Sequence, residues 1–382
     1  MNKIFLLFAS VSIFILTSCQ STETAKQNTA TPALSKPKYI RAEDTSKESQ
    51  LNIPYRTLDM SKTVTTFGFG SCNDQNEAQP LWKLISNKNF DLFLMMGDNV
   101  YASRKENKPI IDQYIILNKQ IDYKKLRETT PFLATWDDHD FGVNDGGSDN
   151  PEKDEARKTY LNYWRYLKSS LPKNQKAIYH SRIVGSKKQR VQFIMLDTRW
   201  DRSALVKNPD YNPEDKTQTG LPKIYLPSTD PTARILSDEQ WQWLESEFKK
   251  PAELRILISS IQLIANDHYF ERWGNFPLER ERFFKLVQKE KIKNLVVLSG
   301  DRHAASIAKY DTPKNGPIYD ITSSGLNKAS RAAAPEVDVT YTAPSFLKIN
   351  YGQAQIDWNK KTVQFDIVDA DDKTQLSQVV KF

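Results

Sequence analysis

Six short clusters of polar residues carry the side chains that could do chemistry in this sequence. The clusters are Gly-Ser-Cys-Asn-Asp (70–74), Met-Gly-Asp-Asn-Val-Tyr (96–101), Trp-Asp-Asp-His-Asp (136–140), Leu-Asp-Thr-Arg (196–199), Asn-Asp-His (266–268) and Ser-Gly-Asp-Arg-His (299–303). Three of the four histidines, His139, His268 and His303, lie in them, whereas His180 does not and is interpreted as a surface or structural residue. A single Gly-Asp pair is most often a turn. Six clusters in one chain indicate an active site.

These residue types suit the cleavage of phosphate esters with the help of metal ions. Carboxylates, an amide, a phenol and a thiol can bind cations that activate water and offset charge on phosphoryl oxygens. The candidate ligands are Cys72, Asp98, Tyr101, Asn144 and Asp301. His303 and His139 could donate a proton to the leaving oxygen. Arg199 and Arg302 could grip phosphate oxygens in the two-pronged geometry of a guanidinium.

The sequence contains two cysteines, Cys19 and Cys72. If lipidation uses Cys19, Cys72 is an unpaired thiol in an oxidising compartment. Burial as a small hydrophobic residue would explain such a thiol. Coordination of a metal as a thiolate would explain it equally well.

The elements that must position these clusters alternate between strands and helices. Nearly continuous apolar runs predict buried strands at 65–71, 91–96, 132–136, 191–196, 255–259 and 295–298. Helical spacing predicts helices at 77–86, 110–127, 152–170, 238–249 and 278–290. Strands dominate after Pro317, at 318–322, 346–351, 354–358 and 363–368. The chain is therefore expected to be an α/β protein with a β-rich end, in which side chains at the carboxyl ends of strands converge on one site.

The stretch 206–233 interrupts this alternation with proline and aspartate residues. It is interpreted as a long insertion or an active-site loop. Tyr211 and Tyr225 within it could cover the site and select the substrate. A plain surface insertion is the other interpretation.

The front of the chain is typical of an exported protein. Lys3 and the apolar stretch 4–16 are followed by Leu-Thr-Ser-Cys at 16–19, which resembles a bacterial lipobox with Cys19 as the lipidated residue. A plain secretory signal is the alternative. We expect a signal peptide at 1–18, a flexible tether at 19–60 and one domain at 61–382, anchored by lipid in the cell envelope and facing the periplasm or the outer membrane.

Composition narrows the class of protein. Hydrophobic residues make up 39% of the chain and charged residues 26%, as in ordinary globular proteins. The net charge of +7 is spread among acidic residues and forms no single basic block. Specific nucleic-acid binding is therefore not expected, whereas anionic substrates would not be repelled. A monomer is expected.

The ordered set of clusters, with Gly-Asp-x-x-Tyr at 97–101, resembles the alkaline phosphatase D (PhoD-like) metallophosphatase family from about residue 63 to 331. This resemblance implies a calcineurin-like metallophosphoesterase fold, a four-layered α/β/β/α sandwich. It also implies a centre of Fe3+ and Ca2+ in which a thiolate and a phenolate help to hold the iron. The residue types alone leave Zn2+ and Mn2+ open.

Carried over position by position, the resemblance assigns roles to individual residues. The implied iron ligands are Cys72, Asp98, Tyr101 and Asp301. Asp98 would bridge toward calcium, with Asn144 beside it, and Asp137 would orient substrate or water. Asn327, in Thr-Ser-Ser-Gly-Leu-Asn at 322–327, is the nearest counterpart of a further calcium ligand. The segment around His268 resembles one in smaller members, so His268 could face the site, or Trp273 and Phe276 could simply close the core.

The segment 322–327 departs from the family's pattern of calcium ligands, and two further departures are visible. Many members carry an amino-terminal β-sandwich domain where this chain has the short tether, so a compact single-domain relative is expected. Asn99 stands where larger relatives can carry a phosphate-binding arginine, a role that Arg302 or Arg199 would have to fill.

The expected function is hydrolysis of phosphate monoesters, diesters or both, with a phosphate ester as substrate. The alternative is a lipid-anchored module on a phosphatase-like fold that binds a ligand and catalyses nothing. A complete ligand set favours the enzyme. Metal-free hydrolysis by a serine is disfavoured because the sequence has no Gly-x-Ser-x-Gly motif.

Overall fold

The structure is a computed structural model that describes residues 46–212, 223–332 and 334–382. The chain divides into two units, Met1–Glu43 and Asp44–Phe382, and the second contains every described residue. The predicted signal peptide, Cys19 and most of the predicted tether lie outside the described residues. The compact unit begins earlier than the expected boundary at residue 61, because Leu51 and Ile53 are buried in the core.

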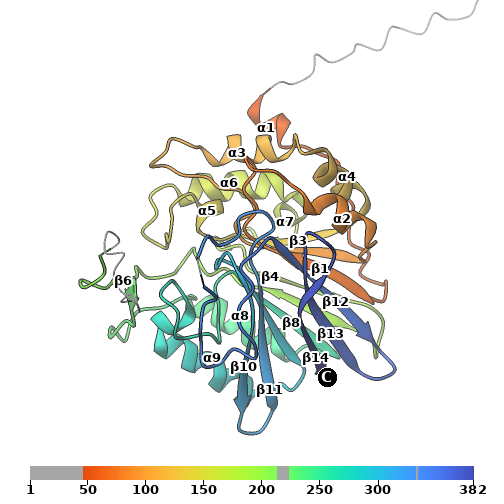
Figure 1. Ribbon diagram of the computed structural model, residues 1–382, viewed down its shortest axis with the longest axis vertical. Helices are drawn as coiled ribbons and strands as arrows, with labels where there is room; N and C mark the ends of the chain where they lie inside the picture. Colours follow the sequence, from red (N-terminus) through yellow and green to blue (C-terminus); the bar gives the residue numbers. More distant parts are fainter. Residues whose placement is uncertain (1–45, 213–222, 333) are drawn as a thin grey trace, which may run out of the picture. The chain divides into compact units, whose positions relative to one another are not determined.

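Two six-stranded sheets form the centre of this unit (Figure 1). The first has the order β14 (Thr374–Lys381), β13 (Thr362–Asp369), β12 (Asn350–Asp357), β1 (Thr66–Gly70), β2 (Leu92–Met96) and β3 (Phe132–Thr135). The second has the order β10 (Ala305–Thr312), β11 (Gly316–Ser323), β9 (Leu295–Ser299), β8 (Leu254–Ser259), β5 (Val191–Met195) and β4 (His180–Val184). Strands β1, β2 and β3 run parallel to one another, as do β5, β8, β9 and β11. A separate hairpin pairs β6 (Val206–Lys207) with β7 (Tyr225–Leu226).

Alternation along the strands explains why the sheets are covered on both faces. In β2, Leu92 and Leu94 join the core between the two sheets, whereas Phe93 and Met95 join the core beneath helices. Successive side chains of a strand point to opposite faces, so a continuous apolar run serves two cores at once.

Helices form the two outer layers (Figure 1). One core unites the outer face of the first sheet with α2 (Leu81–Asn87), α3 (Ile110–Leu117), α4 (Ile121–Thr129), α6 (Lys153–Tyr163) and α7 (Arg165–Lys168). Another core unites the outer face of the second sheet with α8 (Asp238–Phe248) and α9 (Pro277–Lys289). The layers therefore run α/β/β/α, which confirms the predicted fold class. All three cores lie within Asp44–Phe382, so this unit is expected to fold by itself.

Several element boundaries differ from the sequence-based expectation. The single helix predicted at 110–127 is two helices, α3 and α4, and the one at 152–170 breaks at Trp164, whose φ of −88° and ψ of 62° leave the helical region. The strands predicted at 346–351 and 354–358 are one strand, β12. Strands β4, β10 and β14 were not predicted. Edge strand β14 has polar residues at most positions and so lacks an apolar run.

Within the described ranges, no helix is both long enough and apolar enough to cross a membrane.

Candidate active site

The candidate residues follow the carboxyl ends of neighbouring strands. Cys72 follows β1, Asp98 follows β2, Asp138 begins the short helix α5 (Asp138–Phe141) after β3, and Asp301 and His303 follow β9. Their convergence confirms the expectation drawn from parallel strands.

Four of these residues have left-handed backbone conformations. The φ angles are 59° at Cys72, 49° at Asp98, 69° at Asp301 and 54° at His303. A left-handed conformation costs a non-glycine residue roughly 1–2 kcal/mol. Such strain persists where the surrounding structure enforces it and is common at functional sites.

Cys72, Asp98, Tyr101 and His303 make up the first half of the site. The ligand atoms of Cys72, Asp98 and His303 lie within 4.8 Å of one another. The Tyr101 hydroxyl donates to Asp98 Oδ2 at 3.0 Å and lies 2.9 Å from His303 Nε2. Cys72 Sγ lies 3.5 Å from the same Asp98 oxygen. A thiol, a phenol, an imidazole and a carboxyl group thus face one point.

Carboxylates dominate the second half of the site. Two further groups of ligand atoms lie within 4.8 Å of one another, one formed by Asp98, Asp138 and His139, the other by Asp137, Asp138 and Asp301. Asp98 belongs to the first and second groups, and Asp138 belongs to the second and third. Shared carboxylates of this kind can bridge adjacent metal ions.

Asp138 is a site residue that the sequence analysis missed. It lies between Asp137 and Asp140 in Trp-Asp-Asp-His-Asp, and the motif does not tell which carboxylates face the centre. The structure shows that the carboxylates have different roles. Asp140 accepts hydrogen bonds from Tyr114 Oη at 2.8 Å and from the Asn99 amide at 3.0 Å. Asp140 therefore holds the strand ends together.

The electrostatics of the cluster favour a bound cation. Burial, followed by repulsion from neighbouring acids, raises the pKa of Asp98 and of Asp301 well above the usual range. Burial raises the pKa of the Cys72 thiol to about 11. Asp137 Oδ2 is buried without a hydrogen-bond partner among the described residues. Buried acids that cannot all ionise alone can do so around a metal ion, so the donor set fits metal binding.

The imidazole of His303 is held neutral in this surrounding. Burial, followed by the charges of Arg302 and His139, lowers the pKa of His303 to about 4. A neutral imidazole is the form that binds metal ions. His303 can therefore act as a ligand, but in this neutral form it does not suit the expected role of proton donor. The half-buried His139 lines the cavity described below.

Arg199 occupies a different place from the phosphate-gripping one expected. Its side chain is fully buried, and it donates from Nε to Asp137 Oδ1 at 2.6 Å and from Nη1 to Glu271 Oε2 at 2.7 Å. Glu271, which the sequence analysis also missed, is ion-paired with Arg202 at 2.9 Å. With its donors directed at buried carboxylates, Arg199 positions Asp137. Asp137 also accepts from Ser260 Oγ at 2.5 Å.

Arg302 and His268 belong to none of the three metal-ligand groups. Arg302 is ion-paired with Glu336, and its guanidinium lies 3.9 Å from the centre of the Phe270 ring. His268 is buried, and burial, followed by the charges of Arg302 and Arg272, lowers its pKa well below the usual range. Trp273 is fully buried in the core beneath α8 and α9, as the structural interpretation of that segment expected.

The two asparagines expected as calcium ligands are bonded elsewhere. Asn327 accepts from the Asp74 amide at 2.7 Å and donates to the Asp74 carbonyl at 2.7 Å, so both ends of its amide hold the loop after β1. Asn144 is exposed and donates to Asp145 Oδ2 at 2.8 Å. His180 is buried, and its Nδ1 donates to the carbonyl of Ile178, just before β4, at 2.9 Å, in agreement with a structural role.

A cavity of about 1130 Å³ opens onto the first half of the site. The candidate residues that line it are Tyr101, His139, Asn144 and His303. Its cationic lining residues are Arg104, Lys105, Lys108, Lys207 and Lys328, and its acidic ones are Asp74, Glu106 and Asp149. The excess of cations suits an anionic substrate.

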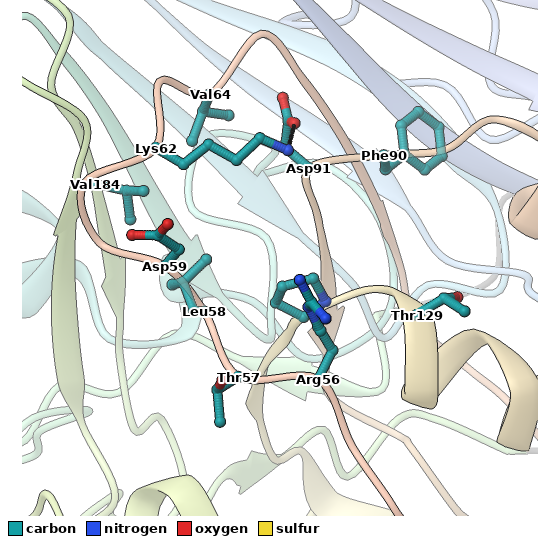
Figure 2. Close-up of a pocket in the computed structure, with 11 residues that line it drawn as sticks. Arg56, Thr57, Leu58, Asp59, Lys62, Val64, Phe90, Asp91, Thr129 and Val184 are labelled. Atoms are coloured by element: carbon teal, nitrogen blue, oxygen red, sulfur yellow. Dashed lines mark ion pairs between the residues drawn. The ribbon is translucent and has the colours of Figure 1, made fainter. Parts of the chain in front are cut away.

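A second, smaller pocket of about 160 Å³ lies at the opposite ends of the strands (Figure 2). It is lined by residues that precede β1, β2 and β3, among them Val64, Asp91 and Pro131. Lys62 and Asp91 form an ion pair of 2.7 Å at its edge. None of the candidate site residues lines it, so it is separate from the site.

Two facing sheets lie between helices, and candidate metal ligands cluster at the strand ends. The PhoD-like phosphatase family matches residues 67–367 of this chain. The chain belongs to the PhoD-like phosphatase family.

Among curated proteins, alkaline phosphatase D of Bacillus subtilis (strain 168) is 25% identical over 281 residues, which cover 63% of this chain and 46% of that protein. The chain thus spans about half the length of this relative.

Solved structures share the fold. A structure of PhoD has a TM-score of 0.64 at 19% identity, covering 85% of this chain and 70% of that one. Purple acid phosphatase PPD1 from yellow lupin (Lupinus luteus) seeds has a TM-score of 0.55 at 12% identity, over 86% and 55% of the two chains. A dimetal phosphatase from Danio rerio has a TM-score of 0.53 at 10% identity, over 84% and 100%.

Proposed function

We propose that this chain is a metal-dependent phosphoesterase that hydrolyses phosphate monoesters, diesters or both. The observation that carries the proposal is the set of three ligand groups joined through Asp98 and Asp138, beside a cavity with a cationic lining. Membership of the PhoD-like phosphatase family supports it.

We propose Fe3+ in the first half of the site and Ca2+ in the second. The thiol of Cys72 and the phenol of Tyr101 suit ferric iron, whereas the carboxylates of Asp137, Asp138 and Asp301 suit a hard cation such as calcium. Bound metal ions would offset charge on the phosphoryl oxygens and activate water. Zn2+ and Mn2+ are the competing occupants.

Other residues of the chain would bind substrate and move protons. His139 lines the cavity and would protonate the leaving oxygen, whereas His303 would serve as a metal ligand. Lys328 lines the same cavity and is ion-paired with Asp74 at 2.6 Å. Unlike the fully buried Arg199, it could exchange this pair for a contact with a phosphate oxygen. Burial raises the pKa of Asp137 to about 8, and Arg199 would oppose this rise and orient Asp137 toward Asp138 and Asp301.

The test uses the unit Asp44–Phe382, purified without chelators. Its metal content and visible spectrum are measured, together with hydrolysis of p-nitrophenyl phosphate and bis-p-nitrophenyl phosphate. Iron with a thiolate or phenolate charge-transfer band, and hydrolysis that disappears in Asp98→Asn, would support the proposal. Cys72→Ala should lose the thiolate part of the spectrum. A protein inactive on both esters after reconstitution with iron, calcium, zinc and manganese would instead be the non-catalytic binding module.

We propose further that the chain is exported and lipidated at Cys19. The apolar stretch 4–16 followed by Leu-Thr-Ser-Cys supports this. Metabolic labelling with a fatty-acid analogue should mark the wild-type chain in the envelope fraction of a bacterial host. Cys19→Ser should remain unlabelled, and equal labelling of both chains would exclude the lipobox.

A further inference from the structure

Exposed apolar side chains gather on loops beside the cavity. Five of the nine exposed large hydrophobic residues in the described part of the chain lie on the β6–β7 hairpin and on two loops. They are Val206 (41% exposed), Leu226 (36%), Phe270 (41%), Val337 (82%) and Val339 (87%), and together we call them the apolar rim. The other four, Met60, Ile121, Leu278 and Val379, lie in four different segments. Single exposed apolar residues are ordinary, whereas a group of them beside a site marks an interaction surface.

Hydrogen bonds tie the three segments of the apolar rim together. Val206 and Leu226 are direct cross-strand partners in the β6–β7 hairpin. The hairpin is joined to the next loop by a bond from the Ile224 amide to the Tyr269 carbonyl at 2.9 Å. That loop is joined to the third by Asp338, whose Oδ2 accepts from the amides of Asn266 and Asp267 at 2.6 Å each. The exposed side chains therefore project from one connected framework.

This framework borders the mouth of the cavity. Lys207, the neighbour of Val206, lines the cavity. Arg302, the neighbour of cavity-lining His303, stacks on Phe270 and is ion-paired with Glu336, next to Val337. A surface that contacts the apolar rim would thus lie beside the entrance to the site.

Two lysines that have no acidic partner in the described part of the chain lie beside the apolar rim. The nearby acids are engaged, Glu336 by Arg302, Asp338 by backbone amides, and Asp267 by Lys223 at 3.9 Å. Lys105 and Lys207 line the adjoining cavity and have no ion pair among the described residues, whereas Lys108 and Lys328 there are paired with Glu106 and Asp74. Apolar side chains on loop ends beside lysines are the combination that binds anionic lipid surfaces, where the apolar groups enter the acyl boundary and the cations face lipid phosphates.

We infer that the apolar rim docks the protein on an anionic lipid bilayer. Docking would place the cavity mouth at the lipid surface, so that phosphate esters of lipid headgroups would reach the site more readily than soluble esters. This consequence rests on the proposed function, whereas the docking itself does not. The expected lipid anchor would hold the unit near such a surface.

The test measures sedimentation of the unit Asp44–Phe382, which lacks Cys19, with vesicles. Vesicles of phosphatidylglycerol mixed with phosphatidylcholine are compared with vesicles of phosphatidylcholine alone. The double variant Val337→Ser/Val339→Ser is compared with Leu278→Ser, a matched change at a residue on α9 that is 52% exposed. A second double variant, Val206→Ser/Leu226→Ser, probes the hairpin.

The expected result is sedimentation with the anionic vesicles that weakens by about tenfold in both rim variants and is unchanged in Leu278→Ser. Hydrolysis of p-nitrophenyl phosphate in solution should be the same in the Val337→Ser/Val339→Ser variant as in the wild type. A wild-type unit that stays in the supernatant, or rim variants that sediment like the wild type, would overturn the inference. So would a rim-dependent dimer in the absence of vesicles, which would make the apolar rim a self-association surface. If the protein sediments with anionic vesicles, loses this in the rim variants and cleaves neither ester, the docking would be supported and the proposed activity refuted.

Discussion

At the residue scale, buried charged side chains keep the site residues in position. Arg199 has no exposed surface and donates hydrogen bonds to two carboxylates, Asp137 and Glu271. The two carboxylates lie in loops that follow different strands. Buried ion pairs of this kind add little to stability relative to an apolar core, but removal of one partner is costly because the other charge stays buried.

Arg199→Met should therefore lower the free energy of unfolding by about 3–5 kcal/mol, measured by urea denaturation of Asp44–Phe382. The double variant Arg199→Met/Glu271→Gln should recover part of this loss, because it removes one of the stranded charges. A loss below ~1 kcal/mol in the single variant would mean that Asp137 and Glu271 do not depend on Arg199.

His180 provides a pH dependence of stability away from the metal ligands. Burial, followed by the charge of Arg182, lowers its pKa from 6.5 to about 3 in the folded protein. The unfolded chain binds a proton below pH 6.5 whereas the folded protein does not until about pH 3, so stability is lost as the pH falls through this window.

Replacement by a residue that does not titrate should remove this contribution. Between pH 7 and pH 5, wild type should lose ~2 kcal/mol more of its unfolding free energy than His180→Gln. Between pH 7 and pH 8 the two proteins should change alike. Parallel curves from pH 7 to pH 5 would show that His180 titrates normally in the folded protein.

At the scale of elements, the β6–β7 hairpin supports the carboxylate cluster. Tyr225 Oη donates to Asp145 Oδ2 at 2.5 Å, and the Asp145 amide donates to Asp138 Oδ2 at 2.7 Å. The stretch that could be read as a surface insertion thus contacts the loop that holds a metal-ligand candidate.

Tyr225→Phe removes the hydroxyl and keeps the ring. Loss of a group that orients a ligand typically lowers metal affinity by about 10-fold or more, and we expect that effect here. Metal titration of the chelator-treated unit is the measurement, and Tyr211→Phe in the same insertion is the control. Equal affinities in the two variants would show that the hairpin does not support Asp138.

At the scale of the whole molecule, the two halves of the sandwich meet through the site. Cys72, Asp98 and Asp138 follow strands of the first sheet, whereas Asp301 and His303 follow a strand of the second. Metal ions held between them would join the two sheets, so binding should stabilise the entire unit.

Removal of metal by a chelator should lower the free energy of unfolding by about 3–4 kcal/mol, relative to protein with free metal at 100 to 1,000 times its dissociation constant. Iron, calcium, zinc and manganese would each be added back in thermal melts. Asp98→Asn should show a much smaller shift, because it removes the carboxylate shared by two ligand groups. Equal shifts in Asp98→Asn and wild type would place the metal elsewhere.

The sequence by itself determined an α/β fold with a β-rich end and the strand ends at which the chemistry gathers. The four layers were expected from the resemblance to the PhoD-like family. Buried strands read as apolar runs, and polar clusters directly after them are local signals. Cys72, Asp98, Tyr101, Asp301 and His303 were found in this way, and the structure brings them together.

The tertiary structure alone decided how each charged group is used. The sequence around Arg199 is the same whether its side chain binds phosphate or buried Asp137. Asp138 and Asp140 lie two positions apart in one motif, yet one joins the ligand groups and the other binds Tyr114. In both cases residues far away in the chain determine the partner. The polar edge strand β14 and the contact of the hairpin with Asp145 likewise rest on distant contacts. Local patterns report which face of an element is buried, whereas long-range packing selects the partner of each buried polar group.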